Sequence, residues 1–490
     1  MRLETTRALG FIGAFYDAEN VTAEFIARRP FGVTLTGAVV LAPVQVSKDS
    51  ETIRGTTWLR VCSADAEPIE RSPRRLRYGD EMDLLEKLRG IDRRLAGFEP
   101  GAARPGVTVI DRVLSPCEVV IGGRPTLMFG SNNYLGLTLH PDVVAAGRDA
   151  IVEYGSGTTG SRTANGTLAL HNVLEDELAD WFGKRHAIIF STGYQANLSL
   201  IAGLCGAHDV ILIDGDSHAS IFDATRQTGA QVIAFRHNAP ESLRKKLDRL
   251  PKGLRNRLVV VEGLYSIRGD VAPLREIVDV CKAYGAYLVV DEAHSLGTYG
   301  STGLGCAEEQ GVLQEVDFVV GTFSKSLGGI GGVCVSDHPE LRALHFLARA
   351  YVFTASGSAS NIASVRAAVR VIRGHPELRR RLWSNIRMLR DGLHARGYVI
   401  GETESPIVPI LTGDEARTIA LWQQLLGEGL YVNVIVPPGC PVDECVLRVS
   451  CSAAHSADHI TRALDIFEHV YAEFTANGLR GTDQRQLMYG

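Results

Sequence analysis

The chain has 490 residues, and 45% of them are hydrophobic, which is enough for a large core and more than one domain. A formal net charge of −5 without a long basic block argues against nucleic acid as a main partner. No run of about eighteen apolar residues and no charged-then-apolar leader pattern occurs. The nine cysteines are scattered without metal-binding spacing. We therefore expect a cytoplasmic protein with reduced cysteines, no metal site and no membrane-spanning segment.

Residues 1–100 are predicted to form an N-terminal extension. Residues 33–43 and 56–61 are typical of short strands, and residues 83–95 of a charged helix. Several arginines precede that helix, namely Arg71, Arg74, Arg75 and Arg77. Two interpretations stay open: an appendage that supports folding or dimerisation, and a docking surface for an acidic partner protein.

The central part of the chain alternates strand and helix signals from residue 186 to residue 336, the pattern of a doubly wound, mostly parallel sheet. The expected strands are 186–190, 210–213, 258–261, 287–290 and 317–320. We expect a large domain over residues 101–370.

The C-terminal part is predicted to be a smaller α/β domain over residues 371–475, with a tail at 476–490. Helices are expected at 376–396 and 414–426, and strands at 431–435 and 445–449. Apolar residues at helical spacing indicate a closing helix at 459–474.

One lysine, Lys325, lies in the glycine-rich segment GTFSKSLGG at 321–329, directly after an expected strand. A lysine amine that is shielded from water can form an imine, and a glycine-rich turn lets the backbone close around a phosphate. Taken alone, an ordinary surface or phosphate-contacting lysine is the commoner explanation of such a turn.

Two further residues with suitable chemistry follow other strands. Asp291 follows residues 287–290, and ligands gather at the carboxyl ends of strands in open α/β sheets. A carboxylate there can keep a pyridine nitrogen protonated, as pyridoxal phosphate (PLP) chemistry requires. His218 follows residues 210–213 and offers a flat ring that can stack on a cofactor. The alternatives are a helix N-cap for Asp291 and a capped core histidine for His218.

These segments occur in the order and spacing of the α-oxoamine synthases, a family of fold-type I PLP enzymes, and residues 126–474 resemble that family closely. The resemblance rests on NNYLGL at 132–137, GSGTTGSR at 155–162, STGYQANL at 191–198, SHASIFDA at 217–224, DEAHSLG at 291–297, GTFSKSLGG at 321–329, YVFTAS at 351–356 and GLYVN at 429–433. It implies a fold-type I transferase with a large PLP-binding domain and a smaller C-terminal α/β domain.

The resemblance also implies the catalytic residues. Lys325 is expected to be the Schiff-base lysine and, once released, the base that removes the Cα proton. Asp291 is expected to pair with the pyridinium nitrogen, and His294 to hydrogen-bond the phenolic oxygen. His218 is expected to stack on the cofactor ring and to help orient the substrate carboxylate.

The cofactor phosphate is expected at the start of the helix that follows residues 186–190. There the backbone N–H groups of Gly193 and Tyr194 and the hydroxyls of Thr322 and Ser324 would hold it. The resemblance places Thr354 of a neighbouring subunit at the same phosphate, which implies a homodimer.

Two acidic or polar residues of the segment EGLYSIRGD resemble family positions near the cofactor oxygen. They are Glu262 and Ser266, and a role in capping a loop turn explains their presence equally well.

For the substrates, the resemblance implies that Asn133 and Arg448 bind the carboxylate of the amino acid, a task suited to the planar guanidinium of arginine. The implied reaction is the decarboxylative condensation of L-serine with a long-chain acyl thioester, palmitoyl-coenzyme A. Its products are 3-ketodihydrosphingosine, coenzyme A and CO2, as in the first step of sphingolipid synthesis.

Three positions depart from the family pattern: Val436 stands for an arginine, Gly357-Ser358 for a pair of prolines and Asn132 for a tyrosine. They leave the identity of both substrates open, the amino acid and the acyl donor. An α-oxoamine synthase that uses glycine or alanine, or an acyl carrier protein as donor, therefore remains an alternative. A PLP aminotransferase is a further one, and a non-catalytic subunit is disfavoured because Lys325 is present.

Overall fold

The computed structural model describes residues 22–28, 34–40, 85–86, 88–89, 105–251, 253–254 and 256–476. The chain divides into two compact units, residues 1–94 and residues 95–490. In the first unit, β1 (Thr22–Arg28) pairs antiparallel with β2 (Thr34–Val40), which falls within the predicted strand 33–43. The predicted strand 56–61, the arginines before residue 78 and most of the predicted helix 83–95 lie outside the described residues.

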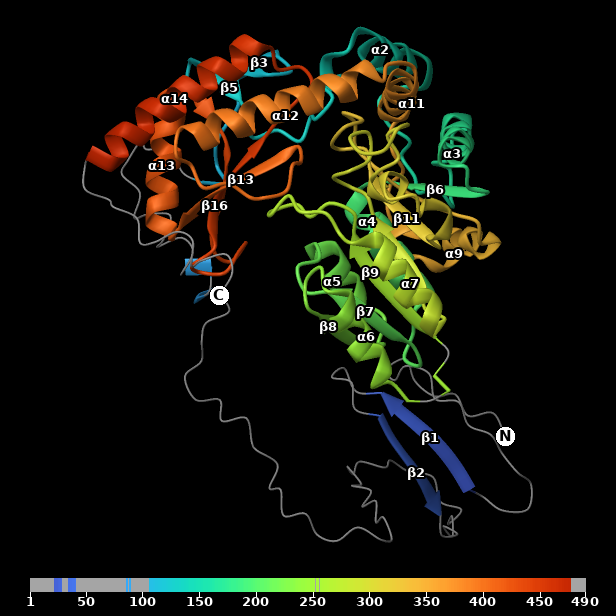
Figure 1. Cartoon of the computed structure of the whole chain (residues 1–490). Helices are drawn as coiled ribbons and strands as arrows, with labels where there is room; N and C mark the ends of the chain where they lie inside the picture. The colour runs from blue at the N-terminus through green and yellow to red at the C-terminus, as the bar shows by residue number, and fades with distance from the viewer. Residues whose placement is uncertain are drawn as a thin grey trace, which may run out of the picture. The chain divides into compact units, whose positions relative to one another are not determined.

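The second unit contains a seven-stranded sheet with the order β6-β12-β11-β10-β9-β7-β8 (Figure 1). Its strands are β6 (His186–Phe190), β7 (Val210–Asp214), β8 (Gln231–Phe235), β9 (Arg257–Glu262), β10 (Tyr287–Asp291), β11 (Phe318–Thr322) and β12 (Gly332–Ser336). Neighbouring strands from β8 to β11 run parallel, whereas β12 is antiparallel to both β11 and β6. The prediction of a mostly parallel α/β sheet is confirmed.

Alternate residues of these strands enter two separate apolar clusters, one on each face of the sheet. In β9, Val259 and Val261 belong to one cluster, and Leu258 and Val260 to the other. Because successive strand residues point to opposite faces, both faces must be covered, which explains the continuous apolar runs in the sequence.

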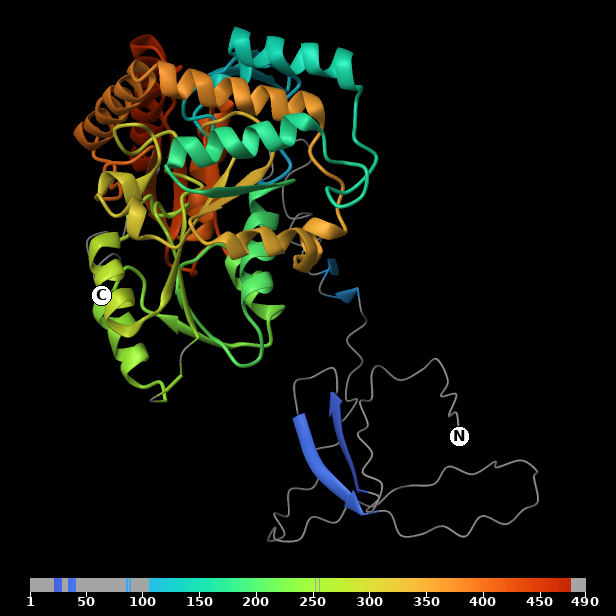
Figure 2. The same ribbon diagram turned by 90° about the vertical axis from the view of Figure 1, so that its right-hand side faces the viewer.

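Helices cover the two faces (Figure 2). The cluster with Val259 also holds buried residues of α3 (Ala169–Phe182), α6 (Pro240–Asp248), α7 (Leu274–Tyr284) and α11 (Ala359–Gly374). The cluster with Leu258 holds residues of α4 (Gly193–Leu204), α5 (Ala219–Arg226), α9 (Leu344–Leu347) and α10 (Arg349–Val352). The sheet is therefore doubly wound.

The second unit also contains two smaller sheets, one from the C-terminal part of the chain and one that joins a C-terminal strand to strands that precede the large sheet. One has the order β13-β16-β15 and comprises β13 (Ile407–Gly413), β15 (Asn433–Ile435) and β16 (Cys445–Ser450). The other has the order β14-β5-β4-β3 and comprises β3 (Arg112–Ser115), β4 (Glu118–Ile121), β5 (Arg124–Met128) and β14 (Leu430–Tyr431). The single predicted strand 431–435 is wrong, because β14 pairs with β5 and β15 pairs with β16.

Other helices of the described part of the second unit are η1 (Leu137–Leu139), α2 (Pro141–Tyr154), α8 (Cys306–Glu309), η2 (Leu313–Glu315), η3 (Pro339–Ala343), α12 (Glu377–Ala395), α13 (Glu415–Gly427) and α14 (Ala457–Ala476). Within the described ranges, none of the helices combines the length and apolarity needed to cross a bilayer. The domain boundary at residue 370 stays a prediction.

Candidate active site

The residues that follow the parallel strands meet around one cavity of about 320 Å³. Its lining includes nine residues that the sequence singled out, namely Gly193, Tyr194, His218, Glu262, Asp291, His294, Thr322, Ser324 and Lys325. They come from the carboxyl ends of β6, β7, β9, β10 and β11. The cavity therefore occupies the place where open α/β sheets bind ligands.

Lys325 stands in the turn after β11 and faces this cavity. Removal from bulk water lowers the pKa of its amine to about 8, although the carboxylates of Asp291 and Glu262 oppose that shift. Arg448 adds a further lowering contribution. With a pKa of about 8, roughly a tenth of the amine is unprotonated at pH 7, and nucleophilic attack by lysine requires this neutral form.

Asp291 is buried at the end of β10, with a side chain fixed from two sides. Asn197 Nδ2 donates to Asp291 Oδ2 at 2.6 Å, and the backbone N–H of Ala293 donates to Oδ1 at 2.9 Å. These donors compensate the burial of a carboxylate and hold it toward the cavity.

His218 caps α5, and its ring is oriented by Ser220. The backbone N–H of Ser220 donates to His218 Nδ1 at 3.2 Å, so a neutral ring carries its hydrogen on Nε2. Burial lowers the pKa of His218, Asp291 raises it and Lys325 lowers it further. The backbone N–H of His218 donates to Glu262 Oε1 at 2.5 Å. Burial and the nearby Asp291 raise the pKa of Glu262 well above its usual range.

His294 is buried beside the same cavity. Its Nδ1 lies 2.8 Å from the hydroxyl of Tyr134, a residue 160 positions away in the sequence. Burial, Lys325, Arg448 and His218 together lower the pKa of His294 well below its usual range. The ring is therefore neutral.

The start of α4 forms a cradle that could hold a phosphate. Thr192 caps this helix by accepting from the backbone N–H of Gln195 at 3.1 Å, which leaves the N–H groups of Gly193 and Tyr194 pointing outward. A Cβ on Gly193 would lie 2.7 Å from Thr322 Oγ1, so only glycine fits there. Thr322 and Ser324 bring two hydroxyls, whose oxygens are 2.9 Å apart.

A second cavity, of about 400 Å³, shares His218, His294 and Lys325 with the first and adds Arg448 and Ser266. Arg448 Nε donates to the carbonyl oxygen of Ser266 at 2.5 Å, Nη1 to Ser450 Oγ at 2.8 Å and Nη2 to the Tyr134 hydroxyl at 3.2 Å. A guanidinium has five N–H donors, so two remain for a ligand carboxylate.

Two predicted residues do not line these cavities. Asn133 is buried, and its Nδ2 donates to Thr138 Oγ1 at 2.8 Å, whereas its neighbour Asn132 lines the second cavity. The structure thus favours Asn132 over Asn133 as the asparagine that faces a substrate. Thr354 accepts from Gln195 Nε2 at 3.2 Å and lies outside both cavities of its own chain.

Sequence reasoning assigned no role to Asn197, Ser220 or Tyr134, although STGYQANL, SHASIFDA and NNYLGL contain them. These side chains hold Asp291, His218 and His294. Together, the lysine, the buried carboxylate, the neutral histidines and the phosphate cradle form a site for imine chemistry on a phosphorylated aromatic aldehyde.

Comparison with known proteins identifies the family of the chain. A family model described as aminotransferase class I and II matches residues 124–467. The serine palmitoyltransferase of Caulobacter vibrioides is 50% identical over 391 residues, which cover 80% of this chain and 97% of that protein. The solved structure of Sphingomonas wittichii serine palmitoyltransferase is 47% identical, with a TM-score of 0.78 over 80% of this chain and 99% of the other. A variant of serine palmitoyltransferase from S. paucimobilis with bound PLP–myriocin is 44% identical, with a TM-score of 0.78 over 80% of this chain and 100% of the other.

Proposed function

The chain belongs to the aminotransferase class I and II family and, within it, to the serine palmitoyltransferases, and from this premise we propose how its residues work. It is a PLP-dependent C-acyltransferase that condenses L-serine with a long-chain acyl-coenzyme A. The products are 3-ketodihydrosphingosine, coenzyme A and CO2. The observation that carries this proposal is the pair of cavities that share Lys325, one of which reaches the start of α4 and the other Arg448.

The residues around the first cavity fit PLP. The cradle of Gly193, Tyr194, Thr322 and Ser324 would hold the phosphate, and the buried Asp291 would hold a proton on the pyridine nitrogen. His218 would lie against the ring, and His294 would donate to the phenolic oxygen. When bound there, PLP supplies an electron sink for the negative charge that develops at Cα of the amino acid.

Lys325 has two tasks in this proposal. Its amine holds the cofactor before serine arrives, and it then accepts the proton that leaves Cα. The pKa of about 8 suits both tasks, because the amine exists in both protonation states near neutral pH.

Arg448 and His218 position the serine carboxylate. The two spare N–H donors of Arg448 form a fork for a carboxylate, and the Nε2–H of His218 adds a third donor. By holding the carboxylate, these two residues set the orientation of the bond that breaks when CO2 leaves. Their contribution to catalysis is therefore orientation and not acid–base chemistry. Arg448 serves here without the arginine that the family pattern has at position 436, which is valine in this chain.

We extend the proposal to the assembly and to the cell compartment. Because Thr354 does not reach the cradle of its own chain, a homodimer in which each subunit supplies Thr354 to the other is proposed. The proposed compartment is the cytoplasm.

The proposal is tested by replacing Lys325. Borohydride reduction of the PLP-loaded protein, followed by peptide mapping, is expected to find the cofactor on the peptide with Lys325. Lys325→Ala is expected to lose turnover, whereas Lys282→Ala, at an exposed lysine paired with Glu315, is expected to keep it. Turnover in Lys325→Ala, or a cofactor reduced onto another lysine, would contradict the proposal.

A further inference from the structure

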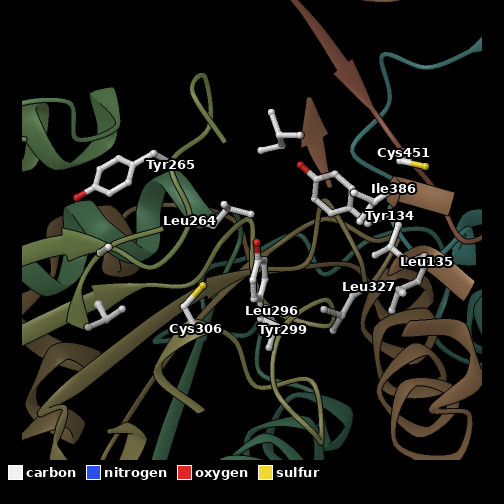
Figure 3. Packing of buried hydrophobic residues seen from close by; sticks show 14 of the residues in the cluster. Tyr134, Leu135, Leu264, Tyr265, Leu296, Tyr299, Cys306, Leu327, Ile386 and Cys451 are labelled. Carbon is white, nitrogen blue, oxygen red and sulfur yellow. The ribbon is translucent and has the colours of Figure 1, made fainter. Parts of the chain in front are cut away.

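Tyr134 has its ring in the hydrophobic core and its hydroxyl among polar groups of the site. Its side chain is 0% exposed and belongs to a cluster that includes Leu135, Leu327 and Ile386 (Figure 3). Its hydroxyl lies 2.8 Å from His294 Nδ1, 3.2 Å from Arg448 Nη2 and 3.1 Å from Asn132 Oδ1. These neighbours belong to three separate segments of the site.

The hydrogens on this group of atoms can be counted. A phenol carries one hydrogen and accepts through its oxygen lone pairs, whereas a guanidinium only donates. Arg448 therefore donates to the Tyr134 oxygen. The single phenol hydrogen then has two acceptors within reach, His294 Nδ1 and Asn132 Oδ1.

Two arrangements satisfy these distances: the phenol donates to His294 Nδ1 at 2.8 Å, or it donates to Asn132 Oδ1 at 3.1 Å and accepts from a His294 Nδ1–H. Only the first arrangement leaves a hydrogen on Nε2, which the phenolic oxygen of the bound cofactor would need as a donor, so we take the first. A neutral imidazole carries one hydrogen, so a ring that accepts at Nδ1 carries it on Nε2. Within the described residues, Nε2 has no hydrogen-bond partner, and His294 lines both cavities.

We infer that Tyr134 is a positioning residue that fixes His294 in the tautomer with hydrogen on Nε2 while it holds Arg448 for the amino-acid carboxylate. The inference rests on the proposed function for the identity of cofactor and substrate. The Nε2–H then faces the cavity as a donor for the phenolic oxygen of the cofactor. In the opposite tautomer, a nitrogen lone pair would meet that oxygen and repel it. One phenol thus links the cofactor side of the site to the substrate side.

The tautomer is measured directly by 15N NMR of the PLP-loaded protein labelled at histidine, without substrate. The resonances of His294 are assigned by their loss in His294→Gln. The wild type is expected to show hydrogen on Nε2, and Tyr134→Phe is expected to lose this preference. Asn132→Ala is expected to keep it, since it removes only the competing acceptor. Hydrogen on Nδ1 in the wild type would overturn the inference whether or not any variant folds, and so would an unchanged tautomer in Tyr134→Phe.

Kinetics supply the second readout. Tyr134→Phe is expected to raise KM for L-serine about tenfold, because Arg448 loses one partner, and to lower kcat through His294. Tyr398→Phe is the matched control, since it removes another buried hydroxyl, which donates to the carbonyl oxygen of Phe467 at 2.8 Å. Unchanged KM in Tyr134→Phe would contradict the role toward Arg448. If the wild type turned over no L-serine, the proposed function would fail, but the NMR result would still decide the tautomer.

Discussion

Replacement of His237 by glutamine tests a partly buried charge cluster formed by His237, Asp214 and Asp270. His237 Nδ1 lies 2.7 Å from Asp214 Oδ1, and Nε2 lies 2.8 Å from Asp270 Oδ2. Both ring nitrogens must donate to satisfy two carboxylates, so the ring is an imidazolium. It ties the ends of β7 and β8 to the loop that carries Ser266, the carbonyl partner of Arg448.

The size of the effect follows from the pKa of His237. Burial alone lowers it, but the hydrogen bonds and charges of Asp214 and Asp270 outweigh burial and raise it from 6.5 to about 10. The rise of the pKa from 6.5 to about 10, at roughly 1.4 kcal/mol per pKa unit, means that protonated His237 contributes at most about 5 kcal/mol to the free energy of unfolding. Because the folded-state pKa is raised, this stabilisation is complete below pH 6.5 and is lost as the pH rises through about 10.

The assay is the free energy of unfolding from urea titrations of wild type and His237→Gln between about pH 6 and about pH 11. The difference in unfolding free energy is expected to be about 3–5 kcal/mol at about pH 6, because Asp214 is fully buried and loses its charged partner, and to shrink toward about pH 11. His338→Gln is the control, because His338 pairs with Asp317 at a more exposed position, where the side chain is 37% accessible. A difference that is below about 1 kcal/mol, or that does not change with pH, would refute the reasoning.

Three further predictions concern the site itself. Arg448→Lys is expected to raise KM for L-serine about tenfold or more without changing the affinity for PLP, because an ammonium cannot replace the planar guanidinium fork. An unchanged KM in steady-state kinetics would contradict the role of Arg448 in binding the carboxylate. Asn197→Ala removes a hydrogen bond to the charged Asp291, worth about 1.5–3 kcal/mol, so equilibrium dialysis should show PLP bound at least tenfold more weakly. Equal affinity would exclude a role for Asn197 in holding Asp291 for the cofactor. The rate at which cofactor-free protein recaptures PLP should rise with pH through about 8, the pKa of Lys325, because only the neutral amine attacks; a flat profile would contradict that pKa.

Much of the fold was predictable because parallel strands buried on both faces leave continuous apolar runs in the sequence. The predicted strands 210–213 and 287–290 lack only the terminal Asp214 and Asp291, whose polarity hides them from an apolar pattern. The strand predicted at 431–435 failed for another reason. Its two halves pair with different sheets, and only long-range contacts decide such a pairing.

The gathering of the candidate residues at the strand ends was also predictable, since their residue types and positions after strands follow simple chemistry. Their supporting partners were not. Asn197 meets Asp291 across 94 positions and Tyr134 meets His294 across 160, and a local pattern carries no information about such distances. The choice between Asn132 and Asn133 likewise depends on which of two adjacent amides the loop turns toward the cavity.

The most direct test of the central claim is thiol release by the purified, PLP-loaded protein with palmitoyl-coenzyme A and L-serine, L-alanine or glycine in parallel, with mass detection of the product. The account predicts serine-dependent release of coenzyme A together with a decarboxylated 3-keto amino alcohol. Release that depends on glycine or alanine instead, or no release with any of the three, would contradict it.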